Sequence, residues 1–285
     1  MIKNRKMKIM LCWMAVVLMI FQGLIIGVAA PLGYYLIHEW IFYVINYVII
    51  IIFLLLYRKN RLVKWIQMIL GLILLVSNST FFYYMGDVNV LVSKSKDKQH
   101  EVILKEYKKM SNETIRLKRR GVLFGKKVAT LMGSSTYKTL EEETYKIDWV
   151  SGDTAVVTYQ VSEKGTLHQS IFNFRSSNYV SYQNVAVSLT GKWFEQDNPQ
   201  NYFMYDAGEI IYAKDGQLYY YSDDDSEQQG IFSIVIKGDE KKPSFTVVLN
   251  SGSVFGDDGL IKDGGTITIY PVTLKELEGK VYYKQ

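Results

Sequence analysis

The sequence predicts a membrane anchor of three transmembrane α-helices followed by an all-β part, an antiparallel meander that forms a barrel or a sandwich. Long uncharged apolar runs fill the first 85 residues, and alternating apolar and polar residues follow, in strands bounded by Gly, Asn, Asp or Pro. The expected units are an anchor over residues 1–85, a membrane-proximal basic β subdomain over 86–185 and an acidic, tyrosine-rich β subdomain over 186–285.

Three apolar runs are long enough to cross a bilayer as helices. No residue is charged over residues 9–37, 40–57 or 65–85. A bilayer core about 30 Å thick needs roughly 20 apolar residues per helix, so spans are expected near 9–30, 40–57 and 65–85. A cleaved signal peptide is the alternative for the first run, because basic residues precede it and it ends in the small residues "GVAA".

Positive charge is unevenly distributed over the flanks of these runs. With the amino terminus in the cytoplasm, the inner flanks hold eight basic residues: Lys3, Arg5, Lys6, Lys8, Arg58, Lys59, Arg61 and Lys64. The outer flanks then hold only Lys94, Lys96 and Lys98. Because basic loops favour the cytoplasmic side, the sequence predicts a multi-pass plasma-membrane protein with residues 86–285 extracytoplasmic.

Turn signals and alternation predict strands throughout the second part of the chain. Three strands are expected around turns at Ser151-Gly152 and Lys164-Gly165, and a hairpin is expected around Asp215-Gly216. Four more follow in "GIFSIVIKG", "SFTVVLN", "GGTITIYPVTL" and "KVYYKQ". Residues 99–110 fit either a helix or a strand.

Charge divides this β part into two halves. Residues 86–185 contain 16 Lys or Arg against 11 Asp or Glu, and residues 186–285 contain 9 against 16. The loop-like segments "SSN" at 176–178 and "QDNPQN" at 196–201 favour a boundary near residue 186. One continuous β domain is the alternative.

Catalytic and metal-ligating patterns are sparse. His38 lies at the outer end of the second span, so only His100 and His168 could act outside the membrane, and no G-x-S-x-G motif is present. Ser135-x-x-Lys138 has the serine/lysine spacing, which other serines of the chain share. One acidic run is a candidate for a divalent cation but lacks the D-x-D-x-D-G register: Asp223, Asp224 and Asp225. We therefore expect no enzyme, no cofactor and no nucleic-acid partner.

A basic stretch, "IRLKRRGVLFGKKV" at residues 115–128, is the clearest candidate contact site. In a strand, Arg116, Lys118 and Arg120 share one face, and Lys126 and Lys127 follow beyond the turn. Such a face suits anionic lipid headgroups or a phosphate-bearing wall polymer, at about 1 kcal/mol per charge near a membrane surface. The alternative is that these charges are solvated or paired with the acidic run that follows.

Aromatic residues are the second candidate contact surface. A tyrosine-rich sheet can display rings that stack on sugars or anchor a protein. The expected contact residues are Trp193, Tyr212, Tyr219 and Tyr221. The alternative is that tyrosine is abundant because it favours strands.

Two resemblances bear on the fold and the setting. "SLTGKWFEQ" at 188–196 resembles the opening motif of lipocalin-type barrels, with Gly191 and Trp193 at the matching positions, and implies a small barrel with a ligand cavity. Lipocalins pair that Trp with a late Arg, and here none follows Arg175. The arrangement with "LFGKK", "YKIDWVSGDTAVVTY" and "GLIKDGGTITI" resembles a group of uncharacterised Gram-positive membrane proteins, which implies a cell-envelope setting.

These features favour a non-enzymatic, membrane-anchored protein whose outer β part binds another envelope component, either a protein or a wall polymer. An immunity or shielding protein against a toxin acting at the outer face is the alternative, because the acidic far half suits a basic toxin. An envelope sensor is a further alternative.

Overall fold

The computed structural model describes residues 5–56, 60–150, 152–175 and 184–285. Several residues used in the sequence analysis therefore lie outside the described residues: Lys3, Arg58, Lys59, Ser151 and the segment 176–178. Contacts divide the chain into unit 1, Met1–Val92 with Val102–Glu142, and unit 2, Ser93–Glu101 with Glu143–Gln285. The sequence instead predicted divisions after residues 85 and 185.

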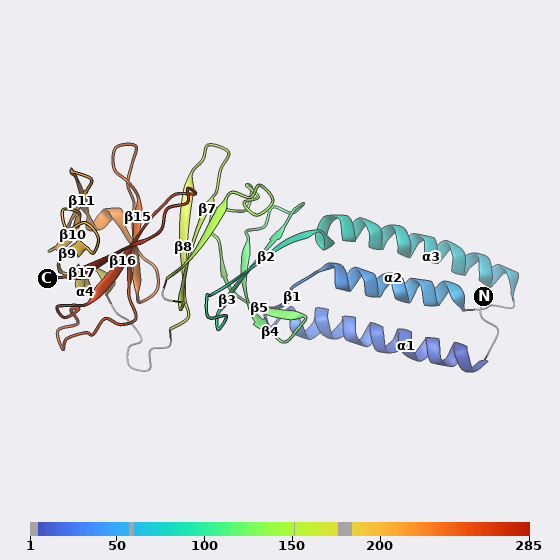
Figure 1. Cartoon of the computed structure of the whole chain (residues 1–285). Helices are drawn as coiled ribbons and strands as arrows, with labels where there is room; N and C mark the ends of the chain where they lie inside the picture. Colours follow the sequence, from blue (N-terminus) through green and yellow to red (C-terminus); the bar gives the residue numbers. More distant parts are fainter. Residues whose placement is uncertain (1–4, 57–59, 151, 176–183) are drawn as a thin grey trace. The chain divides into compact units, whose positions relative to one another are not determined.

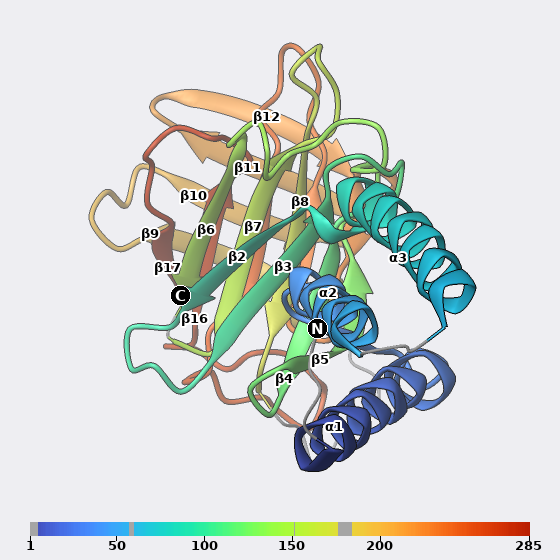
Figure 2. The same ribbon diagram turned by 90° about the vertical axis from the view of Figure 1, so that its right-hand side faces the viewer.

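Unit 1 begins with three antiparallel helices, and α2 packs between α1 and α3 (Figures 1 and 2). They are α1 (Arg5–Leu24) with the π-helical turn η1 (Ile25–Ala29), α2 (Trp40–Leu55), and α3 (Arg61–Phe81) with the π-helical turn η2 (Phe82–Gly86). Among the described residues, two helical segments are long and apolar enough to cross a membrane, Arg5–Ala29 and Arg61–Gly86. The predicted second span is a helix of only 16 residues, because Leu56 leaves the helical conformation with ψ 115°.

A chain of side-chain amides joins the three helices. Gln22 of α1 donates to Asn46 Oδ1 of α2 at 2.8 Å, and Asn46 donates to Asn78 Oδ1 of α3 at 2.8 Å. Asn78 in turn donates to the Tyr43 carbonyl at 3.2 Å. We call these three side chains, Gln22, Asn46 and Asn78, the amide ladder.

In a soluble protein a helix buries its apolar side chains and exposes its polar ones, and these helices show the reverse pattern. Gln22, Gln67 and Asn78 are buried, and Gln67 donates to backbone carbonyls at the end of α2. Large apolar side chains face outward instead, with Trp13 67% and Leu62 68% exposed. Close approach supports the packing, because a Cβ on Gly71 of α3 would lie 2.3 Å from the Leu54 side chain of α2.

A five-stranded sheet completes unit 1, in the order β1-β5-β4-β3-β2. The strands are β1 (Tyr34–Leu36), β2 (Val88–Lys94), β3 (Glu101–Tyr107), β4 (Ile115–Arg120) and β5 (Phe124–Thr130). Residues 101–107 are thus a strand, which decides between the two predicted alternatives. One face of this sheet is held by a small apolar core that includes Ile37, Ile103 and Leu117.

Unit 2 is an all-β antiparallel domain, as the sequence predicted. A three-stranded sheet contains β6 (Tyr145–Val150), β7 (Thr154–Gln160) and β8 (Leu167–Asn173). A nine-stranded sheet contains β9 (Gly191–Glu195), β10 (Tyr202–Asp206), β11 (Glu209–Lys214), β12 (Gln217–Ser222), β13 (Ser226–Gln228), β14 (Ser233–Ile236), β15 (Phe245–Leu249), β16 (Thr266–Pro271) and β17 (Lys280–Lys284). The predicted hairpin turn forms with Asp215 at φ 52° and Gly216 at φ 79°, the backbone that a two-residue turn of this type needs.

The nine-stranded sheet is a nearly closed barrel. Its first and last strands, β9 and β17, pair with each other, and β12 and β13 are its two edges. The 3₁₀ turn η3 (Asp223–Asp225) joins these edges directly. The turn is bonded on both sides, because Asp223 N donates to the Gly208 carbonyl at 3.0 Å and Lys237 N donates to the Asp225 carbonyl at 2.7 Å.

Side chains fill the barrel interior. Trp193 is fully buried and its indole N–H donates to the Leu189 carbonyl, which follows the short helix α4 (Val185–Ser188), at 2.7 Å. The ammonium of Lys284 lies 5.7 Å from the centroid of the Trp193 ring, so a lysine stands over the tryptophan where lipocalin-type barrels have an arginine. The ligand cavity implied by that resemblance is replaced by packed core around Trp193, Phe203 and Phe245.

The predicted aromatic contact surface requires a correction. Trp193, Tyr212 and Tyr221 are buried in the barrel core, and Tyr219 packs against it. The strand alternation was correct, but the face that carries these rings is the inner one because the sheet curls around it. Tyr220, on the opposite face, is the exposed ring, at 60%.

Replacing Asn46 by leucine should destabilise the helices, because Gln22 and Asn78 would each lose a side-chain partner. We expect the free energy of unfolding of the helices to fall by about 0.6 to 2 kcal/mol. The measurement is the midpoint temperature of helix unfolding of the full-length chain in detergent. Val44→Leu, at an outward-facing position of the same helix, is the control and should leave the midpoint unchanged. Equal midpoints for the two variants would contradict the role of the amide ladder.

Replacing Trp193 by alanine should destabilise the barrel by about 3 to 5 kcal/mol, since the change leaves a cavity in a packed core. Near-ultraviolet circular dichroism during denaturant unfolding of the full-length chain would measure this loss. Tyr220→Ala removes an exposed ring from the same sheet and should change the stability by less than about 0.5 kcal/mol. A barrel that tolerates both changes equally well would not be organised around Trp193.

Candidate functional site

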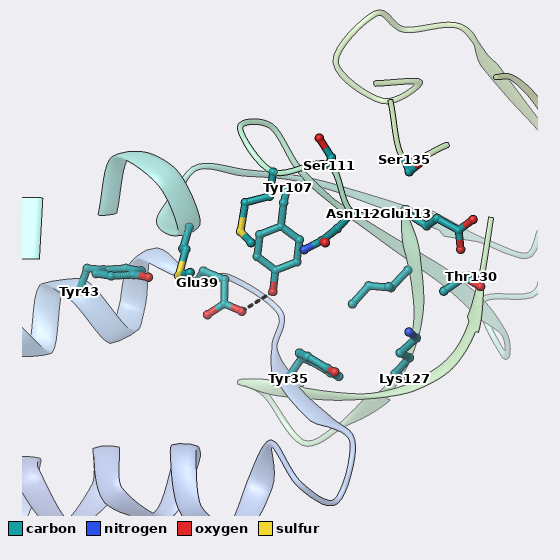
Figure 3. A pocket seen from close by; sticks show the side chains of 13 residues that line it. Tyr35, Glu39, Tyr43, Tyr107, Ser111, Asn112, Glu113, Lys127, Thr130 and Ser135 are labelled. Carbon is teal, nitrogen blue, oxygen red and sulfur yellow. Dashed lines mark hydrogen bonds between the residues drawn. The ribbon is translucent and has the colours of Figure 1, made fainter. Parts of the chain in front are cut away.

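A cavity of about 560 Å³ lies in unit 1, where the ends of helices α2 and η2 meet the sheet. In Figure 3 Glu39 and Tyr43 lie on one side of it, Lys127 and Thr130 on the opposite side, and Tyr107 between them. We call it the Glu39 cavity. Its volume is within the range of pockets that bind small molecules, about 300 to 1,000 Å³.

Local structure explains how these side chains reach one cavity. Glu39 immediately precedes α2, so the helix start fixes its backbone. Tyr35 of β1 pairs with Gly125, two residues before Lys127 of β5, and therefore lies on the same face of the sheet as Lys127. Tyr107 is the last residue of β3. Strands β1, β3, β4 and β5, the ends of α2 and η2, and the loops around Asn112 and Ser135 thus supply the lining.

A buried ion pair supports the cavity from beneath. Lys105 of β3 is completely buried, and its ammonium donates to Glu39 Oε1 at 2.6 Å and to the Leu36 carbonyl at 2.7 Å. Tyr107 donates its hydroxyl to the same Glu39 oxygen at 2.9 Å. No described residue donates to the second oxygen, Oε2, of this partly exposed carboxylate.

Burial dominates the proton affinities in this cluster. Desolvation lowers the pKa of Lys105, and the attraction of the Glu39 carboxylate opposes that change. Burial raises the pKa of the Tyr107 phenol, and the negative charge of Glu39 raises it further. Tyr107 therefore remains a neutral hydrogen-bond donor at physiological pH.

The neighbouring residue of β3 has a structural task on the opposite face. Glu106 is completely buried and its carboxylate accepts hydrogen bonds from Thr114 Oγ1 at 3.1 Å, Leu140 N at 3.1 Å and Glu141 N at 3.0 Å. These bonds fix the loop that follows β5 to the sheet. Lys138 of that loop donates to the Met110, Asn112 and Ser135 carbonyls. Lys138 of the Ser135-x-x-Lys138 pair therefore stabilises the loop by bonding to the backbone of Ser135, not to its hydroxyl.

The predicted basic stretch forms the β4–β5 hairpin, and the structure divides its charges between two faces. Ile115 and Leu117 are core residues, so Lys118 and Arg120 lie on the other face of β4. Lys118 pairs with Lys126 and Leu117 pairs with Lys127. Lys118, Arg120 and Lys126 therefore share one face, here called the basic face, whereas Lys127 lines the Glu39 cavity.

Arg116 differs from the other members of the predicted basic set. It occupies the same side of β4 as Lys118, but it is half-buried and has interactions within the protein. Desolvation lowers the pKa of its guanidinium to about 10. Its contribution to a surface contact is therefore smaller than that of the exposed Lys118 and Arg120.

An apolar groove of about 480 Å³ runs beside the basic face. Phe21, Leu24 and Val28 of α1 and η1 form one wall, and Tyr34, Phe124 and Arg120 form the other. Figure 1 shows the β4–β5 hairpin next to the carboxyl-terminal end of α1. At the hairpin tip Val122 is 86% exposed.

The remaining predicted sites have structural roles. Asp223 accepts a hydrogen bond from the Tyr205 hydroxyl at 2.8 Å, and Asp225 caps the η3 turn through Ser222. Within the described ranges no group of three or more His, Cys, Asp or Glu side chains converges to hold a metal ion. His100 stacks on Phe174 and His168 lies at the edge of Tyr159.

Sequence reasoning missed Glu39, Lys105 and Tyr107. One signal was present, because Glu39 is the only acidic residue among the first 86, between two apolar runs. An isolated carboxylate at such a position indicates function or a buried partner. Lys105 gave no such signal, since a lysine within an alternating strand is normally exposed.

Comparison with protein-family models finds no match for the chain, and neither does comparison with curated proteins or with solved structures.

Replacing Glu39 by glutamine should lower the free energy of unfolding by about 3 to 5 kcal/mol, because Lys105 would remain buried without its counter-charge. The double variant Lys105→Met with Glu39→Gln should recover most of that loss. Unfolding of the full-length chain in detergent, compared among the wild type, both single variants and the double variant, measures the coupling. Losses that simply add in the double variant would show that the two groups do not depend on each other.

Proposed function

We propose that this chain is a multi-pass plasma-membrane protein whose extracytoplasmic β part binds an anionic phospholipid through the basic face of the β4–β5 hairpin. The proposal is non-enzymatic. It combines a membrane anchor, an exposed set of cations and an apolar groove, and each part has its own support.

The polarity of the helices supports membrane insertion of all three. All three helices expose large apolar side chains, and α1 and α3 bury amide side chains, an arrangement that suits a lipid environment and not water. The 16 residues of α2 are close to the minimum of about 17 for a span. The amide ladder binds α2 to both longer helices, so it belongs in the same layer. Basic residues at the starts of α1 and α3 favour a cytoplasmic amino terminus.

The observation that carries the lipid assignment is that the basic face has no carboxylate partner, although the Lys126 ammonium lies 5.8 Å from the centroid of the Tyr34 ring. No carboxylate among the described residues forms an ion pair with Lys118, Arg120 or Lys126. Lys118 and Lys126 lie directly opposite each other, which is unfavourable unless an anion neutralises them. Folding alone gives no reason to gather these charges.

The adjacent groove favours a phospholipid over a free polymer. Its walls are apolar side chains from α1 and the hairpin, and Arg120 is the charged residue among them. A phospholipid can place its phosphate on the basic face and an acyl chain in this groove. A glycerol-phosphate polymer has the phosphates but no chain for the groove.

The test is native mass spectrometry of the full-length chain in detergent, titrated separately with phosphatidylglycerol, phosphatidylcholine and a soluble glycerol-phosphate polymer. Wild type should prefer phosphatidylglycerol. The triple variant Lys118→Gln, Arg120→Gln, Lys126→Gln should weaken its binding roughly 100-fold, at about 1 kcal/mol per charge.

Lys127→Gln is the matched control, because it removes one charge from the same hairpin but from the opposite face. It should retain the preference for phosphatidylglycerol. Equal binding of both lipids by wild type would overturn the proposal. Binding of the polymer with no preference between the lipids would assign the basic face to a wall polymer instead.

A further inference from the structure

We infer that the Glu39 cavity is a second binding site, which takes a small zwitterion with a primary ammonium and a phosphodiester, the chemistry of a phosphoethanolamine headgroup. The ammonium lies toward Glu39 and the phosphate toward Lys127. This site is on the other face of the hairpin from the basic face, so the inference does not rest on the proposed function.

The ammonium end follows from the chemistry around Glu39. Its Oε1 accepts from Lys105 and Tyr107, while no described group donates to Oε2. The tyrosines Tyr35, Tyr43 and Tyr107 line the same cavity (Figure 3). A carboxylate oxygen among aromatic rings attracts a cationic amine, by charge and by contact with the ring faces. Lys105 already occupies one side of the Tyr107 ring, 4.9 Å from its centroid, and shows that this ring accepts an ammonium.

The phosphate end follows from the opposite wall. Lys127 is exposed at the cavity rim, and no ion pair within the described part of the chain uses its ammonium. Hydroxyl and amide groups of Ser111, Asn112, Thr130 and Ser135 also line the cavity, and Figure 3 shows Thr130 on the Lys127 side. One cation with several neutral donors suits a phosphate group, which has more acceptor oxygens than a carboxylate.

Glu113 refines the choice of anion. Figure 3 shows it on the Lys127 side of the cavity, and its Oε1 accepts from Gly133 N at 3.2 Å. Among the described lining residues, Glu39 and Glu113 are thus the carboxylates and Lys127 is the lysine, while Lys105 is buried and bonded to Glu39. This balance disfavours a dianionic phosphomonoester and favours a phosphodiester, which carries one negative charge and leaves the zwitterion neutral.

The experiment is isothermal titration calorimetry of the full-length chain in detergent with glycerophosphoethanolamine as the probe. Ethanolamine, which lacks the phosphate, and glycerol 3-phosphate, which lacks the ammonium, should each bind at least tenfold more weakly. Lys127→Gln should weaken probe binding at least tenfold. Lys126→Gln, the adjacent residue on the opposite face, is the matched control and should leave it unchanged.

A second variant tests the ammonium end without leaving Lys105 unpaired. In the double variant Lys105→Met with Glu39→Gln, the preference for the probe over glycerol 3-phosphate should disappear while Tyr107 and the fold are retained. Circular dichroism would check that the double variant is folded. A preference that survives this change would overturn the orientation and with it the inference.

The source of the headgroup is decided by a parallel titration with phosphatidylethanolamine. Binding of both ligands, or of the lipid alone with the same dependence on Lys127, supports the inference, and lipid-only binding identifies the membrane as the source. Absence of binding by both ligands overturns it. Equal binding of glycerophosphoethanolamine by the wild type and by the Lys127→Gln variant overturns it as well. Loss of phosphatidylglycerol binding in the basic-face variant, with probe binding intact, separates this site from the proposed function.

Discussion

The buried ion pair between Lys105 and Glu39 is the interaction on which unit 1 depends. Taking two charges out of water costs several kcal/mol per ion, so the pair persists only where its geometry and surrounding hydrogen bonds compensate. Here one ammonium bonds to the carboxylate and to the Leu36 carbonyl, and Tyr107 adds a third donor. These contacts join strand β3 to strand β1 and to the start of helix α2. The cavity above the pair has rigid walls for the same reason, since its tyrosine and its carboxylate are already held in place before any ligand arrives.

Strand alternation then distributes the chemistry of unit 1 between two faces. In β3 it places Lys105 under the Glu39 cavity and Glu106 on the opposite side, where the carboxylate fixes the loop after β5. In β5 it places Lys126 on the basic face and Lys127 in the cavity. A small sheet can therefore present an unpaired cationic surface and a polar cavity without conflict between them. Shifting either strand by one residue would exchange the two sets of side chains and destroy both.

Much of the fold followed from the sequence because its signals are local. Uncharged runs located the helices, and turn residues such as Asp215-Gly216 located the hairpins. Helix α2 proved shorter than its apolar run, since Leu56 is apolar yet extended. The site was only half predictable: the basic stretch was visible as a run of charges, but the division of Lys126 from Lys127 needed the register with β4. Lys105 meets Glu39 across 66 residues, and only the folded chain brings them together. The aromatic surface failed because alternation identifies a face without saying whether the sheet curls toward it.

The two units use their aromatic and charged side chains differently. In unit 2 the aromatic residues that the sequence singled out fill the barrel, and the buried Asn201 side chain donates to Glu195 at 2.8 Å. Its acidic turn is likewise occupied by bonds to Tyr205 and Ser222. In unit 1 the β4–β5 hairpin gathers Lys118, Arg120, Lys126 and Lys127 without a carboxylate partner among the described residues, and no described group donates to one oxygen of Glu39. Stability alone does not favour like charges directly opposite each other, as Lys118 and Lys126 are, and an anion supplied by a ligand offsets their repulsion. A ligand with phosphate on one face of the sheet, and with both phosphate and ammonium on the other, supplies what the chain itself does not.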